Sequence, residues 1–231
     1  GPERFMSAPE QVTPAPIKRV GLFGNPLKSD LLDAVVTIAS ICSARGVEVF
    51  ASEDLAGGVP DSISLLPNQD LIEKVGVVIA LGGDGTMLRA GRVLGLSGVP
   101  LLGVNLGSLG YLTDVPLEEL SVAVEQLLAG KFHIDIRSRV YCSVRRDGNK
   151  IATASALNDL VVNMGPLPRA LDMELLMDGD SLGRFLGDGI IVSTPTGSTA
   201  TCCLPLLSRR TRKLICCSPP TRRVHTSGAS T

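Results

Sequence analysis

The sequence predicts an α/β domain followed by a β-rich domain. Between residues 17 and 116, short apolar segments of strand length alternate with segments whose apolar residues recur at helical spacing. From residue 131 onward this alternation stops, and short strand-like segments are separated by turns that contain Asp and Gly. The first pattern is typical of a doubly wound, mostly parallel sheet with helices on both faces.

The α/β domain opens with a short strand, Lys18–Asn25, which ends in Gly-Asn-Pro. Ser29 is expected to cap a helix that runs to about Arg45, where Gly46 ends it. A second strand follows at Val47–Ala51. The apolar positions at helical spacing, expected on the buried face of that helix, are Leu32, Val35, Val36, Ala39 and Cys42.

The second half of this domain starts after a segment, Leu55–Leu66, that has little periodicity and is expected to be a loop. Val75–Leu81 is apolar on both faces, as expected for a strand in a covered parallel sheet. A helix at Thr86–Leu94 and a strand at Pro100–Val104 follow. An amphipathic helix, Leu117–Ala129, then connects the two domains across residues 117–130.

The β-rich domain is expected to cover residues 131–200. Its predicted strands are Arg139–Arg145, Ser155–Met164, Leu171–Met177 and Ile190–Ser193. The predicted turns are at Asp147-Gly148, Asp178-Gly179 and Gly187-Asp188-Gly189.

Composition and charge exclude several classes of protein. Hydrophobic residues make up 44% of the 231 residues and charged residues 19%, which favours a globular chain with a sizeable core. Residues 201–231 hold six Lys/Arg and no Asp/Glu, so residues 1–200 have a net charge of −7, which argues against nucleic acid as a partner. No apolar run approaches the roughly 20 residues that span a bilayer, and no secretory signal opens the chain.

The cysteines and the two ends of the chain complete this picture. Cys42 and Cys142 are isolated, as in cytosolic proteins, whereas the other four cysteines form two adjacent pairs in the tail without the spacing of a zinc site. Residues 1–16 are rich in Pro and Ala and are expected to be disordered.

A glycine-rich turn containing one carboxylate follows the strand Val75–Leu81. In Gly82-Gly83-Asp84-Gly85-Thr86, the glycines are expected to turn with positive φ and allow close approach of a ligand, while amide groups at the next helix N-terminus suit a phosphate. Asp84 would repel a bare phosphate, but it can accept the proton of an attacking hydroxyl or orient a hydrated Mg²⁺. The alternative is that Asp84 simply caps the helix.

Two further polar segments lie in the β-rich domain. The segment Gly187–Ala200, GDGIIVSTPTGSTA, crowds Ser and Thr hydroxyls after an apolar strand and is suited to a polar ligand such as a nucleotide. Asn158 and Asp159 interrupt an apolar strand-like segment, where burying them without partners would be unfavourable. A ligand could satisfy them, or they could cap a turn.

These segments together resemble the bacterial type of the NAD kinase family. The motifs are GGDGT, GVNLGSLGYLTD, LND and GDGIIVSTPTGSTA, in that order, within residues 18–200. A lipid or sugar kinase also has a GGDG-type turn but is not favoured by the last two motifs. The resemblance implies transfer of the ATP γ-phosphoryl group to the adenosine-ribose 2′-hydroxyl of NAD, giving NADP. It also implies a sandwich-like C-terminal domain, a homo-oligomer, and Mg²⁺ that arrives with ATP and has no cage of protein ligands.

The resemblance assigns a role to each candidate residue. It implies that Asp84 is the carboxylate at the ribose hydroxyl and that Gly83, Gly85 and Thr86 form the phosphate turn. Arg89 and Arg92 could neutralise phosphates or could be solvated helix residues. The residues that it places at the NAD site are Asn158, Asp159, Asp188, Thr196, Thr199, Ala200 and Tyr111.

After Ala200 the sequence departs from the family pattern. Thr201 stands where the family has tyrosine, and residues 201–231 are rich in Cys, Arg, Pro and Leu with poor periodicity. We interpret this tail as an out-of-frame reading that adds no core, and the C-terminal domain as incomplete. The expected protein is therefore a cytoplasmic NAD kinase with an altered C-terminus, and the alteration puts the activity of this chain in question. The alternative is a nucleotide-binding fragment without catalysis, and the phosphoryl donor could be ATP or polyphosphate.

Overall fold

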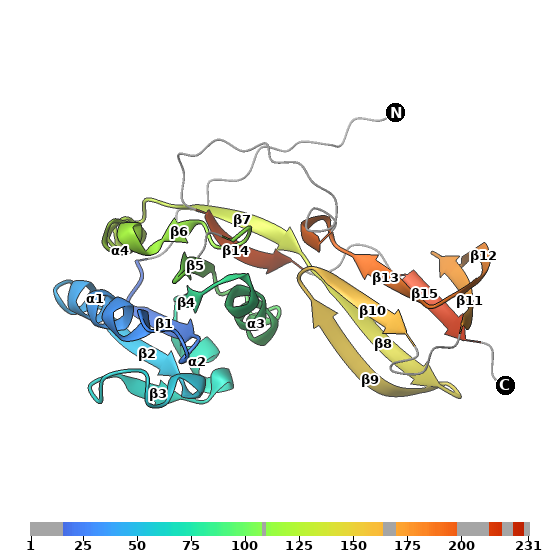
Figure 1. Cartoon of the computed structure of the whole chain (residues 1–231), viewed down its shortest axis with the longest axis horizontal. Helices are drawn as coiled ribbons and strands as arrows, with labels where there is room; N and C mark the ends of the chain where they lie inside the picture. Colours follow the sequence, from blue (N-terminus) through green and yellow to red (C-terminus); the bar gives the residue numbers. More distant parts are fainter. Residues whose placement is uncertain (1–15, 108–109, 164–169, 198–212, 219–223, 229–231) are drawn as a thin grey trace.

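The computed structural model describes residues 16–107, 110–163, 170–197, 213–218 and 224–228. Figure 1 shows an α/β half and a β-rich half that extends from the side of the α/β half carrying helix α3. The predicted fold class is confirmed.

The α/β half is built on a sheet with strand order β3-β2-β1-β4-β5-β14-β7 and with β6 beside β5. Strands β1 to β6 pair in parallel, as predicted. The strands up to β6 are β1 (Arg19–Gly24), β2 (Glu48–Ser52), β3 (Ser64–Leu66), β4 (Val77–Gly82), β5 (Leu101–Asn105) and β6 (Val115–Pro116). The helices are α1 (Leu31–Ser43), α2 (Asn68–Lys74), α3 (Asp84–Leu94) and α4 (Leu120–Leu128), with 3₁₀ turns η1 (Glu53–Leu55) and η2 (Leu117–Glu119).

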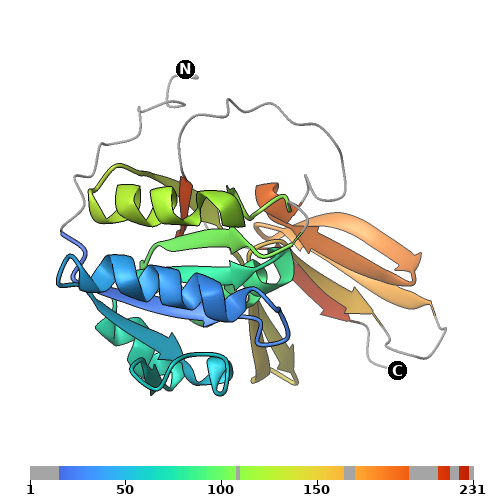
Figure 2. The same cartoon turned by 60° about the vertical axis from the view of Figure 1, so that its left-hand side comes forward.

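Helices cover both faces of this sheet because its central strand alternates apolar side chains between the faces. Ile79 and Leu81 pack in one core cluster with α1 and α4, whereas Val78 and Ala80 pack in a second cluster with α2 and α3. Figure 2 shows α1 and α4 together on one face. The doubly wound arrangement follows directly from these two clusters.

Helix α1 shows two wrong predictions, the N-cap residue and part of the buried face. Its N-cap is Asp30, without a side-chain hydrogen bond, rather than Ser29. Leu32 and Val36 are each 50% exposed. The buried stripe instead consists of Leu31, Ala34, Val35, Ile38 and Cys42. Periodicity alone allowed two neighbouring stripes on this apolar helix, and contact with the sheet selected one of them.

The β-rich half consists of three small sheets. They are the hairpin β8–β9, the pair β10–β13 and the sheet β12-β11-β15. The bounds are β7 (His133–Ser138), β8 (Val140–Arg146), β9 (Asn149–Ala156), β10 (Asp159–Asn163), β11 (Leu171–Met177), β12 (Asp180–Gly187) and β13 (Gly189–Ser193). Asp147 and Asp178 have φ of 50° and 54° before Gly148 and Gly179, so the predicted Asp-Gly turns are confirmed.

The elements absent from the sequence prediction are short or weakly patterned. Strand β3 occupies the end of the predicted loop, and α2, β7 and β12 were not predicted. The predicted strand Ser155–Met164 is divided between β9 and β10 at Leu157 and Asn158.

Two segments of the tail form strands that were not predicted. Strand β14 (Lys213–Ser218) pairs in parallel with β7, and β15 (Val224–Gly228) pairs antiparallel with β11. Backbone pairing at the edges of β7 and β11 requires no amphipathic pattern, so residue periodicity does not predict it. No helix of the described residues is long and apolar enough to cross a membrane.

Candidate active site

The turn after β4 lies where the order of the strands reverses. Because β1 leads to β2 and β3 on one side while β4 leads to β5 on the other, the carboxyl ends of β1 and β4 flank a topological switch point. Ligands of doubly wound sheets bind at such points. The amides of Thr86 and Met87 donate to the Gly83 carbonyl and start helix α3 at this position.

The glycines of this turn differ in the space that surrounds them. None of Gly82, Gly83 and Gly85 has positive φ, so that expectation is wrong. A Cβ on Gly82 would lie 2.2 Å from Thr86 Oγ1, so the close packing of the turn excludes a side chain there. A Cβ on Gly83 or Gly85 would meet no atom within 4 Å, which leaves their backbone open to a ligand.

Asp84 binds the loop that follows β5. Its Oδ2 accepts a hydrogen bond from the Tyr111 amide at 2.8 Å, and its Oδ1 accepts one from the Leu112 amide at 2.9 Å. Thr113 Oγ1 lies 3.5 Å from Oδ1. A Cβ on Gly110 would lie 2.1 Å from Oδ1, so this contact requires glycine at position 110.

This arrangement excludes one of the two interpretations of Asp84. The N-cap of α3 is Gly83 and no side chain caps the helix, so the helix-cap alternative is wrong. A carboxylate has about four lone-pair sites, and the two short bonds from amides leave room for a further donor. Tyr111, predicted near the adenine, is brought beside Asp84 through its main chain, and its side chain is 54% exposed.

A second polar cluster forms around Leu157 and Asn158. The Thr194 amide donates to the Asn158 carbonyl at 2.7 Å, and Thr194 Oγ1 donates to the Leu157 carbonyl at 2.5 Å. A Cβ on Gly197 would lie 2.3 Å from the backbone carbonyl oxygen of Asn158, so glycine is required at position 197. The structure thus brings together the LND segment and the Ser/Thr-rich segment, which are separate in the sequence.

Within this second cluster, the Asn158 side chain is incompletely satisfied. Its Oδ1 is buried and accepts no hydrogen bond from any described residue. An unsatisfied buried acceptor costs about 1–3 kcal/mol, and a donor from a ligand would remove that penalty. Asp159 opens β10 opposite Ser193, and Thr196 is 2% exposed, with Arg137 Nη1 3.4 Å from its Oγ1.

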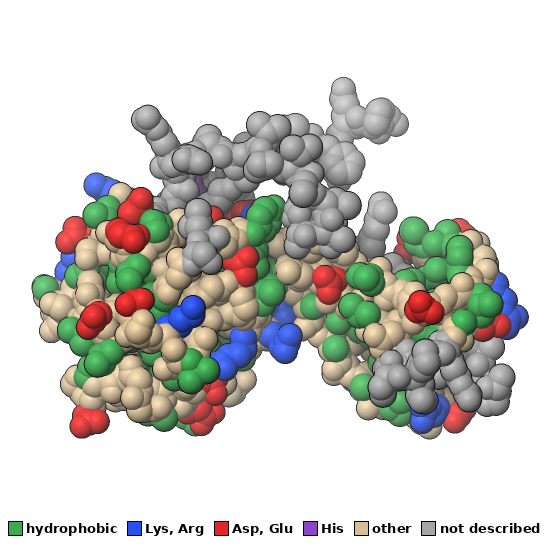
Figure 3. Space-filling view, viewed as in Figure 1, with side chains coloured by type: hydrophobic (Ala, Val, Ile, Leu, Met, Phe, Trp, Pro, Cys, Tyr) green, Lys and Arg blue, Asp and Glu red, His purple; other side chains and the backbone are tan. Residues whose placement is uncertain are grey.

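Helix α3 connects the two clusters. Its first residue is Asp84, and a Cβ on Gly91 would lie 3.9 Å from Leu157 Cδ2. Seven residues of helix span roughly 10 Å, so the second cluster is reached about 10 Å along the helix from the first. Figure 3 shows a hollow between the two halves, with Lys and Arg side chains gathered on the rim of the α/β half.

Two family models match the chain in the regions of these clusters. The ATP-NAD kinase N-terminal domain matches residues 20–132, and the ATP-NAD kinase C-terminal domain matches residues 157–202. An NAD kinase of Acidobacterium capsulatum is 38% identical over 185 residues, covering 80% of this chain and 65% of that protein. An NAD kinase of Laribacter hongkongensis is 35% identical over 184 residues, covering 79% of this chain and 63% of that protein.

The chain belongs to the ATP-NAD kinase family. It spans about two thirds of the length of these relatives or slightly less. The match to the C-terminal model ends at residue 202, next to Ala200, where the departure from the family pattern was predicted.

Solved structures show the same fold. Yeast NADH kinase complexed with NADH aligns with a TM-score of 0.74 and 23% identity, covering 97% of this chain and 75% of that one. An NAD kinase from Archaeoglobus fulgidus in complex with ATP aligns with a TM-score of 0.57 and 23% identity, covering 85% of this chain and 70% of that one.

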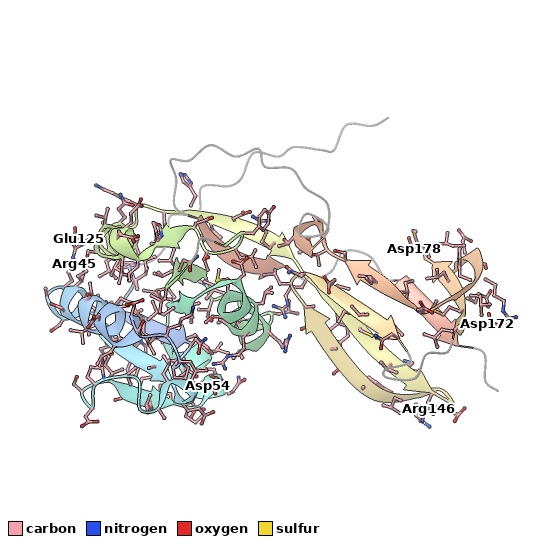
Figure 4. The ribbon with its side chains drawn as sticks, in the orientation of Figure 1. Arg45, Asp54, Glu125, Arg146, Asp172 and Asp178 are labelled. Carbon is pink, nitrogen blue, oxygen red and sulfur yellow. The ribbon has the colours of Figure 1, made fainter. Side chains whose placement is uncertain are left out.

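Some predicted NAD kinase residues lie outside both clusters. Arg89 forms an exposed ion pair with Asp54 at 2.9 Å, and Figure 4 labels Asp54 beside α2. Arg92 is exposed on α3, and Asp188 is exposed between β12 and β13. These placements favour the solvated-helix interpretation of both arginines. Thr199 and Ala200 lie outside the described residues.

Other polar residues belong to the site although the sequence analysis did not select them. Asn105 is 3% exposed at the end of β5, and its Oδ1 accepts the Gly107 amide at 2.9 Å. Lys28 Nζ would lie 3.4 Å from a Cβ on Gly107, which brings a cation to the same edge of the sheet. A polar residue that directly follows an apolar strand was the available signal for Asn105. Nothing local distinguished Lys28, because its place depends on the pairing of β1 with β4.

Within the described residues, no group of three or more His, Cys, Asp or Glu side chains could hold a metal ion. Asp84, with both carboxylate oxygens already bound to amides, is the acidic group at the phosphate turn. This donor set fits a Mg²⁺ ion that is bound mainly by substrate phosphates and waters.

Proposed function

We propose that this chain phosphorylates the adenosine-ribose 2′-hydroxyl of NAD with ATP to give NADP. The observation that carries the proposal is the position of Asp84, at a topological switch point and beside a turn whose glycines leave the backbone open. Family membership supplies the reaction class. Relatives with the name NAD kinase, and solved relatives in complex with NADH or with ATP, support the choice of substrates.

The residues divide between the two substrates. The amides at the start of α3, near Gly83 and Gly85, would hold the phosphates of ATP. Asn158, Asp159 and Thr196 would hold the ribose and nicotinamide groups of NAD, with the Asn158 Oδ1 accepting a donor from the ligand. Lys28 and Asn105, at the same sheet edge as the turn, would complete the phosphate side.

Transfer then requires one proton acceptor and one in-line displacement. The 2′-hydroxyl oxygen attacks the γ-phosphorus, its proton passes to the Asp84 carboxylate, and the bond from the γ-phosphorus to the bridging oxygen of ADP breaks. The products are NADP and ADP. Mg²⁺ bound with ATP would supply neutralisation of the phosphate charge, and Asp84 is the residue placed to orient its water shell.

We further propose a cytoplasmic location and a homo-oligomer. The two isolated cysteines of residues 1–200 support a reducing compartment. The β-rich half exposes apolar side chains such as Leu186 and Ile191, and contact with a second copy of the chain would cover them.

The test is coupled detection of NADP from NAD and ATP with the chain as it stands. NADP formation that requires Mg²⁺ is the expected result, and polyphosphate in place of ATP identifies the donor. Binding of NAD by calorimetry without any turnover would instead identify a nucleotide-binding fragment. That second outcome is considered because the chain spans only 65% of the Acidobacterium capsulatum relative.

A further inference from the structure

Arg139 is a buried charged residue at the junction of the two halves. It lies between β7 and β8 and is 3% exposed, and no other charged residue in the described part of the chain is classed as buried. A guanidinium removed from water is unfavourable unless its N–H groups find acceptors in good geometry. Its contacts therefore indicate what the chain gains from placing it there.

Two described acceptors of Arg139 come from different halves. Nη1 donates to the carbonyl of Gly91, in α3, at 2.5 Å, and Nη2 donates to Ser155 Oγ, in β9, at 2.9 Å. The Gly91 carbonyl also accepts the Gly95 amide, so Arg139 sits at the last turn of α3, where a positive charge is favoured. One side chain thus holds the helix of one half to a strand of the other.

Both acceptors are close in sequence to the site. Gly91 is on the helix that begins with Asp84, and Ser155 is three residues before Asn158. Leu157, between Ser155 and Asn158, packs beside Gly91. Figure 1 shows α3 on the side of the α/β half that faces β9 and β10. A shift of Arg139 would therefore change the position of the Asn158 cluster relative to the Asp84 turn.

We infer that Arg139 is a positioning residue for phosphoryl transfer, which fixes the Asp84-bearing helix against the Asn158-bearing segment. This inference rests on the proposed function. The NAD 2′-hydroxyl, held by the β-rich half, reaches the Asp84 carboxylate of the α/β half only if the two halves are correctly aligned. A displacement of about 1 Å can lower a rate about 100-fold. Arg139 itself contacts neither substrate in this scheme.

The experiment compares Arg139→Lys with the parent chain in the NADP assay. Lysine keeps the charge but lacks the planar fork that reaches two acceptors at once. We expect kcat to fall by roughly 10–100-fold while KM for ATP stays within about twofold, because the phosphate turn lies wholly in the α/β half. Ser155→Ala, which removes only the β9 contact, should lower kcat by roughly 3–10-fold and keeps the test usable if Arg139→Lys folds poorly.

The control is Arg184→Met, on β12 in the β-rich half. Arg184 pairs with Asp172 at the surface, where Figure 4 labels Asp172 at the end far from the α/β half. This control should leave kcat unchanged. If Arg139→Lys and Ser155→Ala lower the melting temperature but keep the parent kcat per folded molecule, Arg139 is only a structural anchor and the inference is overturned. A parent chain that forms no NADP overturns the proposed function and this role with it, so the two failures are distinguishable.

Discussion

The two halves of the molecule differ most in what they bury. Among the described residues, every buried apolar side chain except Leu157 and Met173 lies between Val20 and Leu127, in the α/β half. Exposed large apolar side chains occur in both halves, but in the β-rich half they occur on every strand from β8 to β13, with Leu186 at 76% and Ile191 at 66%. The α/β half therefore has a core on both faces of its sheet, whereas the described residues of the β-rich half form none of comparable size.

This difference separates two kinds of functional residue. Asp84 and its turn stand on a scaffold with its own core. Asn158 and Asp159 lie at the start of the two-stranded sheet β10–β13, and the contacts of this region with its surroundings include Leu157 beside Gly91 and Thr196 beside Arg137. Two-stranded sheets are marginally stable without such support. The geometry of the proposed NAD side of the site therefore depends on contacts with neighbouring elements such as α3.

The largest effect is expected from removing a core side chain of the α/β half. Leu81 is fully buried in β4, so Leu81→Ala should lower the free energy of unfolding by about 2–5 kcal/mol. Leu186→Ala, the same change at an exposed position of β12, should change it by less than about 0.5 kcal/mol. Urea denaturation followed by circular dichroism measures both, and equal losses would contradict the contrast between the halves.

The next effect concerns chemistry on the α/β half. Asp84→Asn removes the proposed proton acceptor and one of the two carboxylate oxygens that accept hydrogen bonds from backbone amides. Turnover should fall at least ~10²-fold while NAD affinity changes little, because most of the proposed NAD contacts belong to the other half. Steady-state kinetics and calorimetry measure the two quantities. Asp54→Asn, at the surface ion pair with Arg89, is the control, and unchanged turnover in Asp84→Asn would remove this residue from the chemistry.

A smaller effect is expected for binding on the β-rich half. Asn158→Ala or Asp159→Ala should weaken NAD binding by roughly 1–3 kcal/mol, because polar groups of the ligand lose their partners. Asn149→Ala, at an exposed position of β9, should leave binding unchanged. Calorimetric titration with NAD separates the cases. A loss of thermal stability without any loss of NAD affinity would assign the pair to the fold alone.

The two described free cysteines, one in each half, differ in their exposure to solvent. Cys42 is fully buried in α1, and burial raises the pKa of its thiol to about 11, partly opposed by Arg45. At pH 8 only about one thiol in a thousand would then be ionised, so Cys42 should resist alkylation. Cys142, on β8, is partly exposed and should react first.

Peptide mass spectrometry after a timed pulse of iodoacetamide measures both sites. Equal labelling of the two cysteines in the folded protein would mean that the α1 face opens as readily as the β-rich half.

Because the folded-state pKa of Cys42 is raised, its contribution to stability is present below the unfolded-state pKa near 9 and is lost as pH rises through about 11. Cys42→Ala should reduce that loss.

Several parts of the fold, and one part of the site, were predictable because they are local. The Asp-Gly turns at 147 and 178 follow from residues that tolerate positive φ, and the turn at Asp84 follows from glycines after a strand that is apolar on both faces. The stripe of α1 was only half predictable, because Leu32 and Val36 are as apolar as the residues that face the sheet. Strand β12 carries two glycines and little β-forming pattern, so only its pairing with β11 identifies it.

The sequence by itself determined the family, the α/β and β-rich order and the motifs, since each depends on residue type and spacing along a few residues. Only the tertiary structure decided which polar groups meet. Asp84 binds the amides of Tyr111 and Leu112, Thr194 reaches the carbonyls of Leu157 and Asn158, and Arg139 joins Gly91 to Ser155. These contacts join residues that are distant along the chain, and strand pairing and burial select them together, so no local pattern carries them.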